Sequence, residues 1–534
     1  MDRASEKRKA AVLLIGTVMY AALFAMLSQI DESGTCSLGK AFVLFLPALP
    51  VALAALWLLL CALPRALDAR RKPVERNREE GRFYTPAAFL LILLSFVPMF
   101  LVFYPGSFMY DTQRQTFQIA GNAYDMFHPL LHTLMIRFAL SFLDRLGSFE
   151  RCAALYSLMQ MTLLAACFAL ICASLSRIRS RRAARWAVLF FMLYPTHMAM
   201  ASNCIKDVLF SGFFALFVTL CVEEACRGLT RGHCALAIVS GILACLLRNN
   251  MIYAVIVWAV ILLLFGRRMK RLLVMALTVI VLAQGANAAL GALTDAAHGS
   301  VAEMLSVPIQ QLARAYRERP ECFTEEDIAC MDALFPDQAY LLYEPTLSDP
   351  VKNAMDTDWL QAHSAQALAL WARIGRQCPG IYLDAFLNLT LTSLYPYSKY
   401  RVAQPYIEVG LQNHVLTGPF AQPDMTSPAR FEGIRRWLDE HIFKTGADDV
   451  PGVRYLFNTG AIFWLCGLCV LVAAMRGDGK RLLVLALPVL LYMTYLLGPV
   501  MQGRYLYPFV CILPTLLMPD RPLQPSAAKE TIGE

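Results

Sequence analysis

Hydrophobic residues occur in long runs that are separated by short polar stretches. Runs of about 18 or more apolar residues are long enough to cross a bilayer as helices, whereas a membrane β-barrel would need ten-residue alternating segments. The alternating pattern is absent here. Helices are therefore expected at 10–30, 38–63, 83–104, 152–175, 186–201, 205–222, 272–293, 455–475, 482–497 and 505–518. The pattern predicts an all-α multi-pass membrane protein.

Two apolar segments need a closer reading. The span 233–265 would be about 50 Å long as one helix, against a hydrocarbon core of about 30 Å. Because Arg248, Asn249 and Asn250 interrupt it, we expect two short helices joined by a turn. The segment 129–146 is read as an interfacial or re-entrant helix, since a crossing there would place the basic stretch 177–182 outside. About 12 transmembrane helices result, with both termini cytoplasmic.

Charge supports this topology. Hydrophobic residues make up 57% of the chain and charged residues 16%, and the formal net charge is +8. The basic residues gather in short loops, which the positive-inside rule places in the cytoplasm. These loops are 65–82, 177–182, 266–271 and 476–481. The positive charge therefore indicates orientation in a lipid bilayer and not binding of nucleic acid. The first apolar run is too long for a signal peptide and no cleavage site follows it, so we expect an anchor.

The same pattern divides the chain into four parts. Residues 1–293 form an N-terminal transmembrane region that includes an outer-loop active-site segment, 105–147. Residues 294–452 are polar and predict a mostly helical extracytoplasmic domain. Residues 453–519 hold the last transmembrane helices, and 520–534 form a cytoplasmic tail. Cys322, Cys330 and Cys378 lie in the polar domain, where they could pair or remain free thiols.

Candidate chemistry lies in the polar turns expected at the outer face. The segment 104–132 carries Asp111, Arg114, Asp125, His128 and His132. A cation near the centre of a membrane helix costs about 2.5–3.5 kcal/mol, so such residues imply a wet cavity or an anionic partner. Arginine and lysine suit phosphate oxygens, and a carboxylate can accept a proton from an attacking hydroxyl. Asp111 is the candidate catalytic residue; the candidate substrate-binding residues are His128, His132, Lys206, Asp207, Arg248, Asn249, Arg504 and Tyr505.

Short motifs in these turns carry a resemblance. The stretches YPGSFMYD, HPLLHTL, KDVLF, LLRNN and GPVMQGRYLYP resemble the motifs of an uncharacterised family of bacterial multi-pass proteins described as glycosyltransferase-like. The layout also resembles the GT-C superfamily of membrane glycosyltransferases, in which an early outer loop carries an acidic residue. Many members have an acidic pair there, whereas Thr112 follows Asp111 in this chain. The second carboxylate is missing or comes from elsewhere.

The resemblance implies a function. A sugar would pass from a polyprenyl-phosphate donor to an extracytoplasmic hydroxyl on a glycan, lipid or protein acceptor, with Asp111 as base or orienter. Arg248, Arg504 and Lys206 would stabilise the departing lipid phosphate. No glycine-rich loop between a strand and a helix is visible, which disfavours a nucleotide-sugar donor. No cofactor is expected, although some relatives of this architecture use a divalent metal.

Plainer interpretations stand beside these. Asp111 could cap a helix, and Lys206 and Asp207 could be a solvated charge pair. Arg248 could extend to lipid headgroups, and Arg504 could belong to an interfacial aromatic belt. His128 and His132 have the i, i+4 spacing of metal ligands but lack the glutamate of a zinc hydrolase motif; they could equally contact substrate or be structural.

Other functions fit the same outline. A lipid-linked glycan transporter or flippase would hold phosphate with the same cations, yet no internal repeat of the transporter kind is evident. A polysaccharide polymerase or ligase would also use outer-loop arginine and histidine. A structural or sensing role is a further alternative.

Overall fold

The computed structural model describes residues 3–62, 83–108, 110–297, 299, 301–398, 429–443 and 454–517. Within these ranges the regular structure is helical, with isolated β-bridges only. Among the described residues, eight helices are long and apolar enough to cross a membrane. They are α1 (Arg3–Ser33), α2 with its π-helical end (Leu38–Ala62), α4 (Thr85–Val102), α8 (Phe149–Ile178), α11 (Lys206–Arg227), α14 (Lys270–Thr294), α23 (Thr459–Arg476) and α24 (Gly479–Leu496). The predicted all-α membrane class is confirmed, while the number of 12 crossings stays a prediction.

Shorter helices occupy the remaining apolar segments. The split expected in 233–265 is confirmed, because α12 (Arg231–Leu247) ends where Arg248 begins a turn and α13 starts beyond it (Met251–Phe265). The single helix expected at 186–201 is wrong: it divides into α9 (Arg181–Leu193) and α10 (Pro195–Ala201). Pro195 has no backbone N–H and disfavours a helical Tyr194, so it starts a new helix. The last apolar segment consists of the 3₁₀ turn η8 (Gly503–Leu506) and α25 (Tyr507–Leu517).

Three short helices follow α4. They are α5 (Tyr110–Gly121), α6 (Leu130–Leu140) and α7 (Leu143–Leu146). Helices α6 and α7 cover the segment 129–146, and neither is long enough to span a bilayer. Ile136 of α6 and Phe108, which precedes α5, pack on Phe149 and Tyr156 in the first turns of α8. The interfacial position of this segment remains a prediction.

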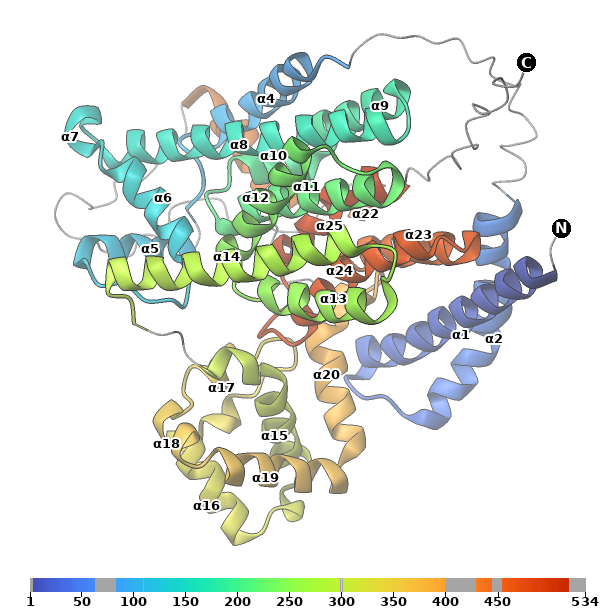
Figure 1. The fold of residues 1–534 in the computed structure, drawn as a ribbon. Helices are drawn as coiled ribbons and strands as arrows, with labels where there is room; N and C mark the ends of the chain where they lie inside the picture. Colours follow the sequence, from blue (N-terminus) through green and yellow to red (C-terminus); the bar gives the residue numbers. More distant parts are fainter. Residues whose placement is uncertain are drawn as a thin grey trace.

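The polar segment forms a helical unit with its own core. Its helices are α15 (Ser306–Glu318), α16 (Glu325–Leu334), α17 (Asp349–Lys352), α18 (Thr357–Ala362), α19 (Ser364–Gln377) and α20 (Pro379–Leu394), with 3₁₀ turns η2 (Val301–Leu305), η3 (Pro320–Cys322) and η4 (Pro336–Leu342). Met331, Phe335, Val351 and Ile374 are completely buried between them. Figure 1 shows α15 to α19 gathered below the other helices, with α20 leading back toward α1. The predicted boundaries of this domain stay a prediction.

Further short elements complete the described chain: η6 (Ala429–Phe431), α21 (Glu432–Leu438), η7 (Asp439–Phe443) and α22 (Arg454–Phe457). The basic loop expected at 65–82 and the tail 520–534 lie outside the described residues.

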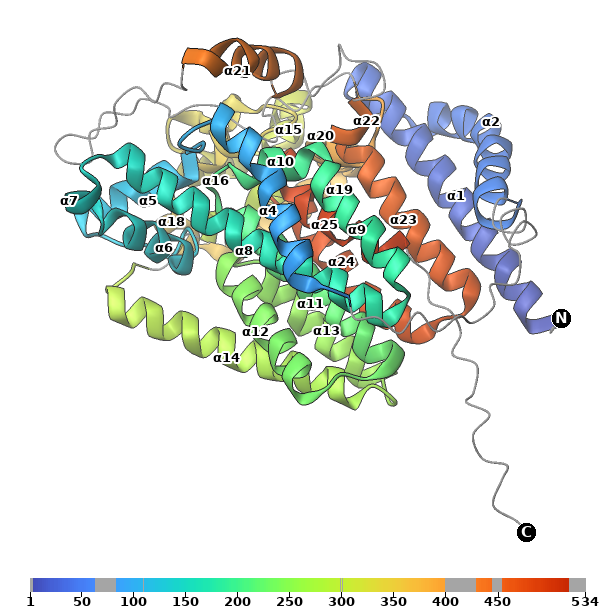
Figure 2. The same ribbon diagram turned by 90° about the horizontal axis from the view of Figure 1, so that it is seen from above.

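Helices α8 and α11 form the centre of the membrane part. In the apolar window of α11, 83% of the residues are buried, against 6% in α2. Figure 2 shows α8 and α11 in the middle of the bundle, with α1 and α2 at one edge and α14 at another. The exposed apolar surface of α2 is typical of a helix that faces lipid, whereas α11 contacts protein on nearly all sides.

The ends of the helices sort into two groups. At one group, Arg177 at the end of α8 pairs with Glu223 near the end of α11, and Arg271 at the start of α14 pairs with Glu224. Nearby, Arg481 at the start of α24 donates to the carbonyl oxygen of Thr515 in α25. We call this group the arginine end. The start of α11 and the ends of α12 and α24 lie together at the opposite end of the bundle, which we call the Asp111 end.

Candidate functional site

A short loop before α5 is fastened to the turn before α11. Gly106 has φ +117°, and a Cβ at this position would overlap the hydroxyl of Ser157. The absence of a side chain therefore permits a close approach. The Ser107 N–H donates to the Ser202 carbonyl at 3.0 Å, and the Cys204 N–H donates back to the Ser107 carbonyl at 2.8 Å. This pairing holds the start of α5 beside the start of α11.

Side chains reinforce the same junction. The Thr112 hydroxyl donates to the Cys204 carbonyl oxygen, one turn into α5. On the other side, the Gln160 amide of α8 donates to the carbonyls of Ala201 and Asn203, at 3.1 and 2.8 Å. These are bonds between buried polar groups, which stabilise only when both partners are satisfied. They fix the position of the residues on either side, Asp111 and Lys206.

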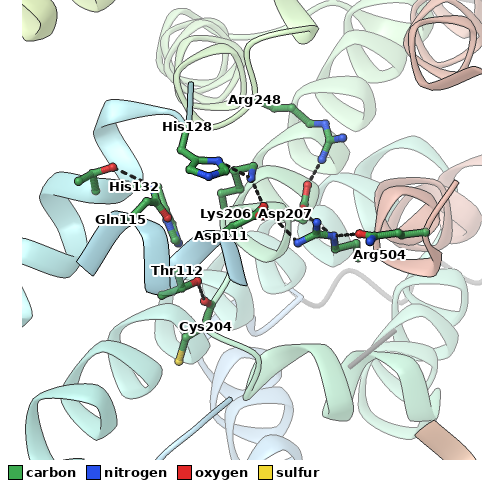
Figure 3. Close-up of polar contacts among 12 residues, drawn as sticks. Asp111, Thr112, Gln115, His128, His132, Cys204, Lys206, Asp207, Arg248 and Arg504 are labelled. Atoms are coloured by element: carbon green, nitrogen blue, oxygen red, sulfur yellow. Dashed lines mark hydrogen bonds and ion pairs between the residues drawn. The ribbon is translucent and has the colours of Figure 1, made fainter. Parts of the chain in front are cut away.

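Five charged side chains form a continuous row at the Asp111 end (Figure 3). Lys206 and Arg504 both donate to Asp111 Oδ2, the latter at 3.2 Å. Arg504 also lies 3.8 Å from Asp207 Oδ2, measured from its Nε, and Arg248 pairs with Asp207 Oδ1. The turns that carry these residues are far apart in sequence. The structure thus brings together Asp111 and the three cations that the sequence predicts to lie near it.

Exposure differs along the row. The side chains of Asp111 and Lys206 are 17% and 12% exposed, whereas Asp207 is 1% exposed. Asp207 Oδ2 has no hydrogen-bond partner among the described residues. Solvent therefore reaches the row at both ends, at Asp111–Lys206 and at Arg248, whereas Arg504 and Asp207 in its middle are enclosed. The idea of a solvated Lys206–Asp207 pair is wrong, because each side chain pairs with a different segment.

The electrostatics of Asp111 follow from these neighbours. Burial by itself raises the pKa of its carboxyl, but the charges of Arg504 and Lys206 outweigh that effect and hold the pKa well below its usual range. In the protein without ligand Asp111 is therefore ionised and is a weak base. Burial, with Lys206 next in size, lowers the pKa of His128 well below its usual value, so that this ring is neutral.

Arg248 is held by aromatic rings as well as by Asp207. Its guanidinium carbon lies 4.4 Å from the ring centre of Tyr495 and 4.5 Å from that of Tyr505. Such cation–π contacts are favourable when the cation is desolvated. Its side chain is 11% exposed, so it does not extend to the headgroups. Tyr505 also lies near Arg504, 5.2 Å from ring centre to guanidinium carbon, which places this predicted binding residue in the wall of the row.

The two histidines have different environments. His128 Nδ1 lies 3.3 Å from Lys206 Nζ, at the edge of the charged row. His132 is completely buried, and its ring nitrogens lie 2.7 Å from the Gln115 amide oxygen and 2.7 Å from the Tyr156 hydroxyl. Burial lowers the pKa of His132 to about 3. We therefore assign His132 to the packing between α5, α6 and α8 and keep only His128 as a candidate for substrate contact.

The other polar residues of the loop stabilise the loop itself. Asp125 pairs with Arg114 at 3.2 Å and accepts from the Phe127 N–H at 3.0 Å. Asn249, predicted to bind substrate, donates to the Met126 carbonyl at 3.1 Å. It joins the turn after α12 to this loop. The carboxylate that accompanies Asp111 in the row is Asp207, from another helix, and not Asp125.

Two members of the site were missed by the sequence reading. Tyr495 lies inside an apolar helix, where an aromatic residue signals nothing beyond packing. Gln502 accepts from Arg504 Nε and orients that guanidinium. Among the described residues no group of three or more His, Cys, Asp or Glu side chains could hold a metal ion. The only expected ligand pair, His128 and His132, is divided between the charged row and the core.

Comparison with known proteins gives one family. No curated protein and no solved structure matches the chain. One family profile matches residues 126–531, about three quarters of the 534 residues. The matched range starts after Asp111 and includes Lys206, Arg248 and Arg504. The chain belongs to this family, DUF6020, a family of unknown function.

Proposed function

We propose that the protein is an integral membrane glycosyltransferase with a GT-C-like architecture of about twelve crossings. It would transfer a sugar from a polyprenyl phosphate to an acceptor hydroxyl at the extracytoplasmic face. The observation that carries the proposal is the row of Lys206, Asp111, Arg504, Asp207 and Arg248, in which three cations accompany two carboxylates. A half-buried group with excess positive charge favours an anionic ligand.

The cations supply what a phosphate leaving group requires. When the acceptor oxygen bonds to the anomeric carbon, the bond from that carbon to the phosphate oxygen breaks and its electron pair stays on the phosphate. Charge therefore grows on the phosphate in the transition state, where fixed positive groups stabilise it most. Lys206 and Arg504 both contact Asp111, the most exposed side chain of the row, and are the groups that would receive it.

Asp111 would accept the proton of the attacking hydroxyl. Without ligand its charge is balanced by Lys206 and Arg504, which keeps it a weak base. A phosphate that engages the same two cations would compete with Asp111 for them, and the pKa of the carboxyl would rise toward its ordinary value. Donor binding would thereby strengthen the base only when there is a sugar to transfer. Asp207 would hold Arg248 and Arg504 in position throughout.

The distribution of charge supports the proposed orientation. The arginine end carries the described basic loops 177–182, 266–271 and 476–481, which the positive-inside rule assigns to the cytoplasm. The Asp111 end also carries the polar helical unit, since the Ser348 N–H donates to the Pro499 carbonyl at 2.9 Å, just before Arg504. Both would then lie outside, where flipped polyprenyl-linked sugars and acceptors are found together.

The test is a substitution that removes the base and keeps its shape. Asp111→Asn should lower transfer from a panel of radiolabelled polyprenyl-phosphate sugars, in membranes containing native acceptors, by about 10²–10⁴-fold. Asp125→Asn is the matched control, because this carboxylate lies in the same loop but pairs with Arg114. Equal transfer by both variants would refute the role of Asp111.

The transport alternative has a separate readout. If the purified protein in sealed liposomes moves a labelled polyprenyl-phosphate sugar between leaflets, and Asp111→Asn preserves this movement while no transfer occurs in any preparation, the flippase function replaces the proposed one. A polymerase or ligase would instead require a diphosphate-linked donor in the same assay.

A further inference from the structure

Two cysteines of the polar helical unit meet although they are distant in sequence. Cys322 ends the 3₁₀ turn η3 that follows α15, and Cys378 lies between α19 and α20. Their sulfur atoms are 3.3 Å apart and their positions are 56 residues apart. Cys330, the third cysteine of the unit, is buried inside α16 and packs in the core of the unit with Met331. The structure thus selects one pair out of three possible ones.

We propose that Cys322 and Cys378 form a disulfide bond in the mature protein. A disulfide has an S–S length of about 2.05 Å, so the two sulfur atoms need to approach by little more than 1 Å, roughly one side-chain torsion adjustment. Each thiol loses its proton, and the two electrons reduce the disulfide of a dithiol oxidase to two thiols. The inference rests on the proposed extracytoplasmic placement of this unit, where such oxidants act, and not on sugar transfer.

Access and burial suit this reaction. Cys322 is partly exposed and can reach an oxidase, whereas Cys378 is buried beside it and can complete the bond from within. Thiol–disulfide exchange needs one accessible sulfur and a second one within reach. Other described cysteines, such as Cys167, Cys172 and Cys221, lie inside long apolar helices where no oxidase could act.

The bond would lie at the base of the helix through which the unit reaches the membrane part. It closes a loop that contains α16, η4, α17, α18 and α19, and it fixes the end of α15 to the start of α20. Helix α20 in turn reaches the bundle, since Asn388 donates to the Gly34 carbonyl at 2.7 Å and Leu394 accepts from the indole of Trp464 at 2.6 Å. A crosslink at this point restricts the unfolded chain and so stabilises the folded unit.

The experiment uses the full-length protein from its native membrane. Free thiols are blocked with N-ethylmaleimide in intact cells, and the purified protein is digested with trypsin and a glutamate-specific protease. Glu325 and Glu326 lie between Cys322 and Cys330, so the digest separates these two cysteines. We expect a Cys322–Cys378 crosslinked peptide that reductant removes. Alkylation of both sulfur atoms in most molecules would overturn the proposal.

Variants give the matched controls. Cys330→Ser should retain the crosslinked peptide, while Cys322→Ser should yield alkylated Cys378. Reductant should lower the unfolding temperature of the wild type and of Cys330→Ser by several degrees and leave that of Cys322→Ser unchanged. Equal sensitivity of all three proteins to reductant would count against the bond.

The outcomes separate this inference from the proposed function. A crosslink in a protein whose Asp111→Asn variant still transfers sugar leaves the disulfide intact and refutes the catalytic assignment. If both thiols are free, a membrane-impermeant maleimide applied to right-side-out vesicles shows why no disulfide forms. Labelling of Cys322 would place the unit outside and refute only the bond. Protection of Cys322 from the reagent would refute the extracytoplasmic placement as well.

Discussion

Helix α11 carries a buried carboxylate near each end, and the two differ in their partners. Asp207 lies in its first turn and Glu223 in its last, about 24 Å apart at 1.5 Å per residue. Glu223 accepts from Ser174 at 2.6 Å and from Arg177 at 2.6 and 2.7 Å, so both of its oxygens are used. Asp207 pairs with Arg248 through one oxygen, while the other has no hydrogen bond in the described structure.

The difference shows how a structural ion pair can be told from a binding site. At the arginine end both oxygens of Glu223 are satisfied, and the second cation near it, Arg227 at 4.0 Å, is 46% exposed, so that water balances its charge. At the Asp111 end Lys206, Arg504 and Arg248 outnumber Asp111 and Asp207, and part of the row is accessible. Unbalanced charge at a half-buried position costs free energy unless a ligand completes it. The imbalance is therefore a signal of function that simple burial does not give.

The largest effect expected from this comparison is on stability. Asp207→Asn removes the counterion of buried Arg248 and should lower the free energy of unfolding by about 3–5 kcal/mol. Glu223→Gln should cost a similar amount, because it weakens two bonds to Arg177. Equilibrium unfolding of both variants in detergent measures these losses of stability. Only Asp207→Asn should in addition abolish sugar transfer after normalisation to folded protein; equal residual transfer by the two variants would remove the distinction between the ends.

The second largest expected difference between the Asp111 end and the arginine end is the effect of ligand binding on stability. Farnesyl phosphate at a hundred times its dissociation constant should stabilise the wild type by about 2.7 kcal/mol. Arg504→Gln should lose most of this gain, since Arg504 is one of the two cations that contact Asp111, the most exposed side chain of the row. Thermal unfolding with and without ligand gives the measurement.

Two controls make that result specific. Arg177→Gln should retain the stabilisation, because Arg177 lies at the arginine end. Farnesol, which has the same chain without the phosphate, should stabilise neither protein. Stabilisation by farnesol equal to that by farnesyl phosphate would show that the row does not bind the phosphate.

Sequence reasoning predicted the meeting of the turns because a membrane restricts where turns can lie. Once hydropathy and basic loops set the topology, Asp111, Lys206, Arg248 and Arg504 had to share one surface. The break at Arg248 followed from the length of the span and its polar interruption, and the reading of 129–146 as a helix that does not cross followed from the basic stretch 177–182. These predictions use hydropathy, segment length and the positions of basic residues. In a membrane protein these quantities determine on which side of the bilayer a turn lies.

The partners of each side chain were beyond that reasoning. Hydropathy does not show that Asp207 faces Arg248 and Arg504, or that His132 turns away from the row toward Gln115. Such contacts depend on the rotation of each helix and on tertiary packing. Tyr495 shows the limit well, since its ring covers Arg248 although it lies in a largely apolar helix. Pro195 could have predicted the helix break after Tyr194. We predicted one continuous helix there because the apolar run continues through the proline.

Acid should affect the two buried histidines, His132 and His128, before it affects the carboxylate of Asp111. The pKa of His132 is lowered to about 3, so the folded protein takes up this proton less readily than the unfolded chain does. The stability is present above about pH 6.5 and falls as the pH drops toward 3, by about 2 kcal/mol between pH 7 and 5. His132→Gln should reduce this dependence by that amount in unfolding measurements.

The charged row has another pH window. The pKa of Asp111 is held well below its usual value, so its contribution is present above about pH 4 and is lost only in stronger acid. Asp111→Asn should therefore leave the slope of stability between pH 7 and 5 unchanged. A slope that changes in Asp111→Asn but not in His132→Gln would reverse the two assignments.

The smallest effect should come from the exposed pair in the loop of Asp111. Arg114 and Asp125 lie 3.2 Å apart, but their side chains are 52% and 27% exposed. Solvent screens such a pair, and its removal by Arg114→Gln should change the free energy of unfolding by less than about 1 kcal/mol. Binding of farnesyl phosphate should also remain, as the same thermal unfolding assay would show. If Arg114→Gln abolished this binding, the phosphate would contact the loop and not the row of Lys206, Arg504 and Arg248, and the charge imbalance of that row would no longer indicate the binding site.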